Sequence, residues 1–394
     1  MNMNQTAQQS RNTRGGVSYV YVSYVTSNAG YIAVIDPTTD EIIKRITTGR
    51  NPTAMCLNPS GDKLYVADAY VPAVFVYSTE TFNLIGEIPI SGKNPAAIFV
   101  DPSGKKGYVI NYGDSSVAIF HAITFKSLGT AYLYRTPLGF AGNENSPFLY
   151  LACNVLPPDP DSILIIATDT DTDTDTNIDI DTDTNNSVAN FDIGTDQVCI
   201  NDTPPNPLTV HPNGHTVVRL GNSGYLYFVN PNSNFISKET SLLDNTVSGV
   251  YLDNGMLFCT MREERDFLKL FKNLDIDKNG NITYDDFKEI PSYKGQDKIR
   301  TSLTQKYIGV TIKPYDSPLG GLQIYDVDHG TSRFVELASI GDLAFFSDSK
   351  AYVGGFNHVT PFDLATARPL TPIAIGTVRF RVKNVICGYS YQTP

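Results

Sequence analysis

The chain of 394 residues carries 30 lysines and arginines against 41 aspartates and glutamates, which gives a formal net charge of −11. Because a nucleic-acid partner requires a basic surface that displaces its counterions, this charge balance argues against nucleic-acid binding. The composition includes 23 tyrosines, 30 glycines, 24 prolines and no tryptophan, which favours many short strands joined by tight turns.

Residues 1–16 are rich in asparagine and glutamine and are expected to form a polar N-terminal tail. This segment lacks the apolar core of a secretory signal, and no other stretch reaches the roughly 18 apolar residues of a membrane span. We therefore expect no membrane insertion, and the sequence leaves the export route open.

From residue 17 onward the sequence repeats. Similar tetrapeptides begin at Tyr24, Tyr65, Tyr108 and Tyr150, at intervals of about 42 residues. Each unit continues through polar turns and segments that alternate between apolar and polar residues. Four short strands in a unit of this length are typical of a propeller blade. Since one blade cannot bury both faces of its sheet alone, the blades are expected to stack around an axis.

The strand that opens each unit gives a blade count. Such strands begin near Thr53, Ala96, Leu138, Leu208, Ser248, Ile299, Asp342 and Val378. We therefore predict an all-β fold, a β-propeller of eight four-stranded blades in a single domain over residues 17–394. Seven blades remain compatible, because the sixth unit is irregular. The C-terminal strand Val378–Val382 is expected to pair with the N-terminal strand Tyr19–Val25 and so close the ring.

The repeat also carries a family resemblance. The segments are Ile35–Ile43, Gly49–Pro52 and Asn58–Val66, with weaker copies at Asn206–Val229 and Leu343–Leu364. They resemble the YVTN β-propeller repeat of microbial surface-layer and related proteins. The resemblance is close over Val17–Gly113, and it implies an extracellular or cell-surface location. It specifies the architecture more strongly than the function, because propellers include enzymes, receptors and scaffolds.

The cysteines show no sign of a disulfide framework or of paired metal ligands. They are Cys56, Cys153, Cys199, Cys259 and Cys387, an odd number without CxxC spacing. Most of them lie in or beside apolar strand patterns, so we expect buried free thiols. This pattern favours a reducing compartment or a large fold that needs no disulfides, so an intracellular location stays open.

The sequence shows no catalytic grouping, and we predict no catalytic residues. The five histidines lie on different units without metal-ligand spacing, and His211 and His215 flank a turn, where we expect solvent exposure. The arginines nearest to inner-strand positions are Arg135, Arg219 and Arg262, which we interpret as rim residues.

An acidic insertion occupies residues 167–187 of the fourth unit. Thr168–Asn186 is an almost pure alternation of threonine and aspartate. In an extended chain the aspartates would project to one side. One interpretation is a solvated acidic loop without defined structure. The other is a ladder of carboxylates that collects cations or a basic partner.

A second insertion, residues 263–291, contains a candidate calcium loop. Asp275–Asp286 matches the twelve-residue EF-hand loop, with oxygen ligands expected from Asp275, Asp277, Asn279, Asn281 and Asp286 and a sharp turn at Gly280. The sequence therefore predicts a Ca²⁺ site. Aspartate in place of glutamate at the last position lowers the expected affinity or indicates a dockerin-like geometry. The flanking apolar residues fit either helices or the strands of a blade.

Two functional hypotheses follow. The first is a non-enzymatic surface or scaffold propeller that binds a protein or glycan partner, assembles with copies of itself and contains a calcium-stabilised loop. The alternative is a propeller enzyme of the lactonase type with its active site in the axial funnel. Ionisable groups that converge on the inner strands would favour the enzyme. An intracellular interaction hub is a third reading.

Overall fold

The computed structural model describes residues 18–27, 29–133, 135–142, 148–154, 161–167, 187–194, 208–212, 217–220, 223–230, 235–244, 246–261, 265–277, 281–313, 320–376, 382 and 384–387. Across these ranges the chain forms strands, turns and irregular segments, without a helix. The described residues accordingly include no helix of a length and hydropathy that would cross a membrane.

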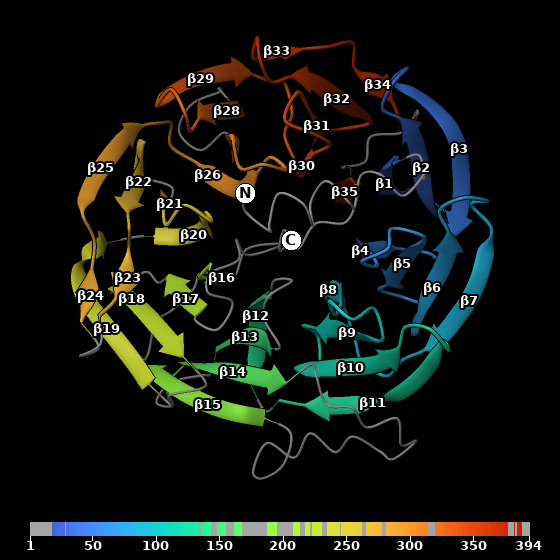
Figure 1. Cartoon of the computed structure of the whole chain (residues 1–394). Coiled ribbons are helices and arrows are strands. Elements are labelled where there is room, and N and C mark those ends of the chain that lie inside the picture. The colour runs from blue at the N-terminus through green and yellow to red at the C-terminus, as the bar shows by residue number, and fades with distance from the viewer. Residues whose placement is uncertain are drawn as a thin grey trace.

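Eight sheets form the blades of a ring around a central axis (Figure 1), which confirms the predicted all-β propeller and its count of eight. Seven of these sheets have four strands, and in the eighth an additional short strand pairs with the third.

The first four blades, each taken from the inner strand to the outer one, come from the N-terminal half of the chain. Blade 1 consists of β35 (Asn384–Cys387), β1 (Val20–Val25), β2 (Gly30–Asp36) and β3 (Glu41–Thr48). Blade 2 consists of β4 (Pro52–Leu57), β5 (Lys63–Asp68), β6 (Ala73–Ser78) and β7 (Leu84–Pro89). Blade 3 consists of β8 (Pro95–Val100), β9 (Lys106–Asn111), β10 (Ser116–His121) and β11 (Lys126–Tyr132). Blade 4 consists of β12 (Thr136–Ala141), β13 (Phe148–Asn154), β14 (Asp161–Ala167) and β15 (Ser187–Gly194). Only β35, the inner strand of blade 1, comes from the other end of the chain.

The other four blades follow the same order. Blade 5 consists of β16 (Leu208–Val210), β17 (Val217–Leu220), β18 (Ser223–Asn230) and β19 (Phe235–Asp244). Blade 6 consists of β20 (Thr246–Tyr251), β21 (Leu257–Met261), β22 (Phe267–Lys272) and β25 (Asp286–Pro291), with the hairpin β23 (Asp275–Ile276) and β24 (Ile282–Thr283) inserted before β25. Blade 7 consists of β26 (Gln296–Thr301), β27 (Tyr307–Ile312), β28 (Gly321–Asp326) and β29 (Thr331–Glu336). Blade 8 consists of β30 (Leu343–Phe345), β31 (Lys350–Gly354), β32 (His358–Asp363) and β33 (Arg368–Pro369), with β34 (Ile373–Ala374) also paired to β32.

The antiparallel pairing gives the ring two different ends. The first-to-second strand connections of blades 2 to 8 and the third-to-fourth connections of every blade lie at one end, where Thr79 donates its backbone N–H to the carbonyl of Asp62. Both sequence insertions connect a third strand to a fourth, so we call this the insertion end. The second-to-third connections and the links between blades lie at the opposite end, which we call the crossover end.

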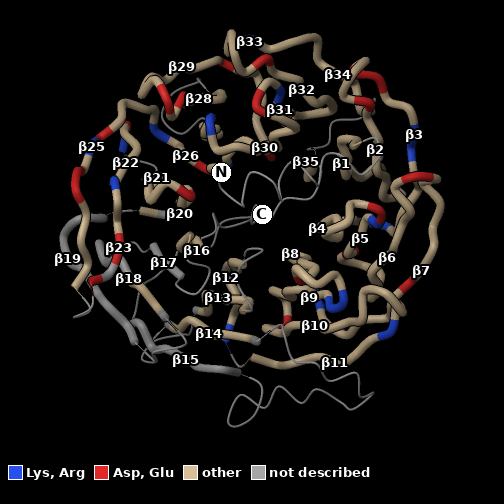
Figure 2. The backbone as a smooth tube through the Cα atoms, viewed as in Figure 1, with Lys and Arg blue, Asp and Glu red and all other residues tan. Residues whose placement is uncertain are grey.

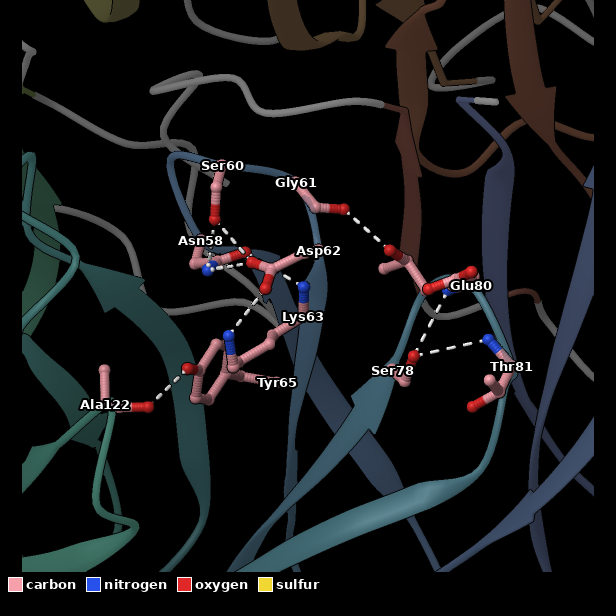
Figure 3. A network of polar contacts seen from close by, with 11 residues as sticks. Asn58, Ser60, Gly61, Asp62, Lys63, Tyr65, Ser78, Glu80, Thr81 and Ala122 are labelled. Atoms are coloured by element: carbon pink, nitrogen blue, oxygen red, sulfur yellow. Dashed lines mark hydrogen bonds and ion pairs between the residues drawn. The ribbon is translucent and has the colours of Figure 1, made fainter. Parts of the chain in front are cut away.

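The core is divided among the interfaces between neighbouring blades. Each of the eight clusters of buried apolar residues lies between two adjacent blades. In six blades a fully buried aromatic side chain on the second strand contributes to the interface with the next blade, namely Tyr21, Tyr65, Tyr108, Tyr150, Phe258 and Tyr352. The hydroxyl of Tyr65 donates to the carbonyl oxygen of Ala122 in blade 3 at 2.7 Å (Figure 3). These rings therefore join each blade to its neighbour.

The register of the first blade differs from the one expected from the repeat. Tyr21, rather than Tyr24, is equivalent to Tyr65, because both lie opposite the residue two positions before the end of the third strand. Tyr24 stacks on Tyr31, with ring centroids 5.4 Å apart. Since side chains alternate between faces, a shift of three residues places Tyr24 on the face toward blade 8 and Tyr21 on the face toward blade 2.

The ring is closed by pairing of the two chain ends, as predicted, but with a different C-terminal strand. β35 pairs with β1 over four residues, from Val20 opposite Cys387 to Ser23 opposite Asn384. The expected strand Val378–Val382 lies outside the described residues except for Val382, which is buried but is not part of a strand. The apolar alternation continues from that segment into Val385 and Cys387, so the sequence pattern alone did not separate the two candidates.

Deletion of residues 384–394 should abolish cooperative thermal unfolding, because it leaves β1 with an unpaired edge and uncovers the cluster between blades 8 and 1. Differential scanning calorimetry would measure this, with deletion of 391–394 as the control. A truncated chain without β35 that melts like the parent would contradict closure by this strand.

Candidate functional site

Five charged residues gather where blades 7 and 8 meet near the axis. They are Asp297, Lys298 and Arg300 on the inner strand β26, Lys313 directly after β27, and Asp342 directly before β30. Figure 2 marks charged positions along β26 on the axial side of its blade. Lys313 Nζ lies 3.0 Å from Asp297 Oδ1, and Arg300 Nη2 lies 3.9 Å from Asp342 Oδ1. We call these five residues the axial charge cluster.

The position of Arg300 is apolar in most other blades. Arg300 lies opposite Gly309, the position equivalent to the buried aromatic residue of the second strand. The inner-strand residues at this register elsewhere are Cys56, Phe99, Ala141, Val250, Ala344 and Ile386, with Thr209 in blade 5. An arginine that is only 7% exposed is therefore a local departure from the repeat.

A second register, two residues earlier on the inner strand, divides the ring into two sides. Blades 6, 7, 8 and 1 carry Ser248, Lys298, Asp342 and Asn384 there, whereas blades 2, 3 and 4 carry Ala54, Ala97 and Gly139. Polar residues on this side also reach the next blade: Asp342 Oδ2 accepts the N–H of Val385, and Asn384 Nδ2 donates to the carbonyl of Thr53. The inner strands thus form a continuous polar arc from blade 6 to blade 1.

Gly309 explains how blades 7 and 8 pack without an aromatic residue at this position. A Cβ on Gly309 would lie 2.7 Å from Leu343 Cδ2 and 2.9 Å from Phe345 Cζ. The side chains of β30 therefore pack directly on the backbone of β27. The contact between these two blades consists of this apolar packing together with the charged groups near the axis.

Arg300 and Asp342 do not form a hydrogen bond with each other. Arg300 Nη1 donates to the carbonyl of Ile299 at 3.0 Å, but the distance of 3.9 Å to Asp342 Oδ1 is too long for a hydrogen bond. Asp342 Oδ1 is buried and has no hydrogen-bond partner among the residues that the structure describes. A buried acceptor and a buried donor thus lie close together without a hydrogen bond between them, an arrangement that costs free energy in an empty site.

The electrostatics of the axial charge cluster favour a negatively charged ligand. Burial lowers the pKa of Lys298, opposed by the nearby charge of Asp342, and burial also lowers the pKa of Arg300. Three basic side chains face two acidic ones, which leaves one excess positive charge when all are ionised. This local excess occurs in a chain whose net charge is −11.

The predicted calcium loop forms a β-hairpin between strands. β23 pairs with β24, and on either side Lys272 of β22 lies opposite Asp286 of β25, so strands and not helices flank the loop. Asp277 and Asn281 are brought together: the Asn281 N–H donates to Asp277 Oδ1 at 2.8 Å, and Asn281 Nδ2 lies 3.0 Å from Asp277 Oδ2.

The other predicted calcium ligands have different neighbours. Asp275 Oδ1 lies 3.5 Å from His211 Nε2, and Asp286 Oδ2 lies 3.3 Å from Lys272 Nζ and 3.9 Å from Lys288 Nζ. Asn279 lies outside the described residues. In the part of the chain that the structure describes, no three histidine, cysteine, aspartate or glutamate side chains gather as a metal site would require.

Several smaller predictions can be compared with the structure. His211, expected to be exposed, is 9% exposed: its ring packs against Tyr251 with ring centroids 4.7 Å apart, and its Nε2 lies 3.5 Å from Asp275 Oδ1 of the inserted hairpin. Cys56, Cys153, Cys259 and Cys387 are free thiols, as expected, whereas Cys199 lies outside the described residues. The acidic tract Thr168–Asn186 also lies outside them and connects β14 to β15.

The arginines selected from the sequence are not those of the axial charge cluster. Arg135 lies between β11 and β12, Arg219 lies in β17 opposite Leu208, and Arg262 lies outside the described residues. Arg300 was missed, although an alignment of the inner strands reveals it. Gln296–Arg300 contains three charged residues where Pro52–Cys56 and Pro95–Phe99 contain none.

Comparisons with known proteins identify the fold alone. No protein-family model matches the chain, and no curated protein matches it. Among solved structures, dihydro-heme d1 dehydrogenase NirN is similar with a TM-score of 0.63 at 12% identity over 93% of this chain and 76% of that one. Sqt1 of Saccharomyces cerevisiae is similar with a TM-score of 0.62 at 10% identity over 87% and 94%. A putative 6-phosphogluconolactonase from Bacteroides uniformis has a TM-score of 0.54 at 13% identity over 82% and 97%.

Replacement of Lys298 by methionine should raise the melting temperature at neutral pH, because it removes a charge that is desolvated in the folded chain and lies in a cluster with one excess positive charge. The folded-state pKa of Lys298 lies below its ordinary value of about 10.4. The folded chain therefore loses this proton before the unfolded chain does, and the cost of the buried charge fades as the pH rises toward that ordinary value. The difference in melting temperature between Lys298→Met and the wild type should accordingly shrink between pH 7 and pH 10.

Melting curves of both proteins across this pH range would measure the effect. Lys93→Met, at an exposed site, is the matched control. A Lys298→Met protein that is less stable than the parent at pH 7 would show that the charge contributes to stability.

Proposed function

We propose that the protein is a non-enzymatic β-propeller of the YVTN type that binds a protein or glycan partner at a cell surface and assembles with copies of itself. The observation that carries this proposal is the distribution of exposed aromatic side chains. Four of the five in the described residues lie at the crossover end, namely Tyr70 (70% exposed), Tyr132 (53%), Phe356 (49%) and Tyr293 (42%). Exposed aromatic residues are typical of binding surfaces, because they bury a large area at a small cost in side-chain entropy.

The backbone around Tyr70 is held in place by a buried carboxylate. Asp68, at the end of β5, accepts N–H groups of Tyr70 and Val71 at Oδ1 and of Arg50 and Asn51 at Oδ2, at distances of 2.6 to 2.9 Å. The guanidinium of Arg50 lies 5.8 Å from the centroid of the Tyr70 ring. Tyr70 and Arg50 therefore form a pre-organised aromatic and cationic contact surface.

The ring of Tyr293 is also held in place by a neighbouring residue. It follows β25 in the link between blades 6 and 7, and its ring packs on Phe334 of blade 7 with centroids 4.0 Å apart. Blade 8 contributes Phe356, whose backbone N–H donates to the hydroxyl of Ser339 at 2.9 Å. The aromatic residues thus come from blades on different sides of the ring. A partner that covers the whole end, such as a second ring stacked on the axis, fits this distribution.

The triple variant Tyr70→Ser, Tyr293→Ser, Phe356→Ser should weaken self-association at least tenfold, or about 1.4 kcal/mol, because interface aromatics commonly contribute more than this. Sedimentation velocity over a concentration series would measure the dissociation constant. The control is Ile43→Ser, Leu84→Ser, Ile123→Ser, which removes exposed aliphatic residues away from the crossover end. Equal loss in both variants, or a wild-type chain that stays monomeric, would argue against assembly through this end.

The proposal includes calcium binding by the inserted hairpin, at Asp275, Asp277, Asn279, Asn281 and Asp286. The loop spacing and the closeness of Asp277 to Asn281 support it. Calcium must compete with Lys272 and Lys288 for Asp286, so we expect a dissociation constant on the order of 10⁻⁴ to 10⁻³ M, as in extracellular modules.

Calcium at tenfold excess over this constant should therefore stabilise the chain by about 1.4 kcal/mol relative to chelator. Asp277→Ala should abolish the calcium-dependent rise in melting temperature. Lys288→Met should enlarge it, because one competing cation is removed. Identical melting curves with calcium and with chelator in the wild type would show that this segment is an ordinary turn without a calcium site.

A second function, an enzyme of the lactonase type, is favoured by one observation. The axial charge cluster places ionisable groups with lowered pKa values on the inner strands, where an axial active site would lie. The structural likeness to a putative 6-phosphogluconolactonase is one of fold. Hydrolysis of a sugar lactone by the wild type and its loss in Arg300→Leu would distinguish this function from the interaction function.

A further inference from the structure

Arg300 and Asp342 each have hydrogen-bonding capacity that the described contacts leave open. A guanidinium has five N–H donors, and the contacts of Arg300 are one hydrogen bond to Ile299 and the 3.9 Å approach to Asp342. Asp342 Oδ1 is a buried acceptor without a donor in the described part of the chain. A molecule that contacts both groups must therefore offer acceptors to Arg300 and a donor to Asp342.

The charges of the cluster add a second requirement. Asp297 is 7% exposed and is neutralised by Lys313 at 3.0 Å, so that pair is balanced. The remaining groups are two cations, Lys298 and Arg300, and one anion, Asp342. Water would supply hydrogen bonds but no charge, and a phosphate dianion would overcompensate beside the carboxylate of Asp342. A monoanion balances the three groups.

We propose that the axial charge cluster binds a small hydroxylated carboxylate, whose carboxylate group is held by Arg300 and Lys298 and whose hydroxyl group donates to Asp342. Arginine suits this role because its planar fork binds a carboxylate through two parallel hydrogen bonds. The site lies on the inner strands and takes a small molecule, whereas the proposed partner surface consists of exposed aromatic side chains, so the two are tested by separate experiments.

The inner strands carry polar residues on one side of the ring and small residues on the other, and this division supports the proposed ligand. The polar arc continues from Lys298 and Asp342 to Asn384 in blade 1, whose amide nitrogen donates to Ser23 Oγ and to the carbonyl of Thr53. On the other side of the ring, Ala54, Ala97 and Gly139 occupy the equivalent register with small side chains. A ligand that is polar along one side matches these inner strands.

Isothermal titration calorimetry of the full chain with four probes tests the proposal. D-gluconate carries both required groups, sorbitol has only hydroxyls, acetate has only the carboxylate, and inorganic phosphate, titrated above its second pKa, is a dianion without a hydroxylated carbon. Gluconate should bind at least tenfold more tightly than sorbitol, acetate or phosphate. Lys298→Met, Arg300→Lys and Asp342→Asn should each weaken gluconate binding at least tenfold, whereas Lys93→Met should leave it unchanged.

Melting curves would first establish that each variant is folded, and Lys298→Met is expected to be more stable than the parent. Absence of binding by gluconate at concentrations up to about 10 mM would show that the cluster serves the packing of blades 7 and 8 alone, and would overturn the proposal. Unchanged gluconate binding by Lys298→Met, or tighter binding of phosphate than of gluconate, would overturn it as well. Self-association of Lys298→Met should equal that of the wild type, so a failure to bind gluconate leaves the interaction function to its own test.

Discussion

The fold depends on one constraint: a blade has two apolar faces, and only its neighbours can cover them. Each cluster of the described core accordingly lies between two blades, and none lies within a single blade. A buried aromatic ring at one register of the second strand, such as Tyr65 or Tyr352, fills the space toward the next blade. The first and last blades must then meet, and β35 beside β1 is the outcome of that requirement.

The same constraint shows where blade 7 departs from the repeat. Where the repeat places an aromatic residue, this blade has Gly309, and the residue opposite it is Arg300. Leu343 and Phe345 fill the space, so the change keeps the interface packed. A buried arginine and a partly buried lysine nevertheless lower stability where an apolar pair would raise it. Residues that break the local pattern at a cost in stability are commonly those retained for binding.

The sequence predicted the features that repeat and missed those that depart from the repeat. The spacing of Tyr65, Tyr108 and Tyr150 was enough to predict four-stranded blades and a closed ring. It misplaced the first blade by three residues, because Tyr21 and Tyr24 both fit a tyrosine followed by valine, and only the pairing with β2 distinguishes them. His211 packs against Tyr251 and approaches Asp275, and no local sequence pattern contains either of these distant contacts. Arg300 was visible in the sequence, but its significance depends on knowing which residue it faces.

The two insertions lie at the same connection of their blades, and this connection is suited to the attachment of additional chain. One follows β14 and the other follows β22, so both extend the connection between a third and a fourth strand, at the end of the ring away from Tyr70 and Tyr293. Extra chain at such a connection costs only the slowly growing entropy of a longer loop, since the strands on either side stay paired. The outer connections of this ring therefore act as natural attachment points. A reporter domain or an affinity tag could be placed there, in blade 4 or in any blade with a short turn at that position, while the inner strands keep their contacts.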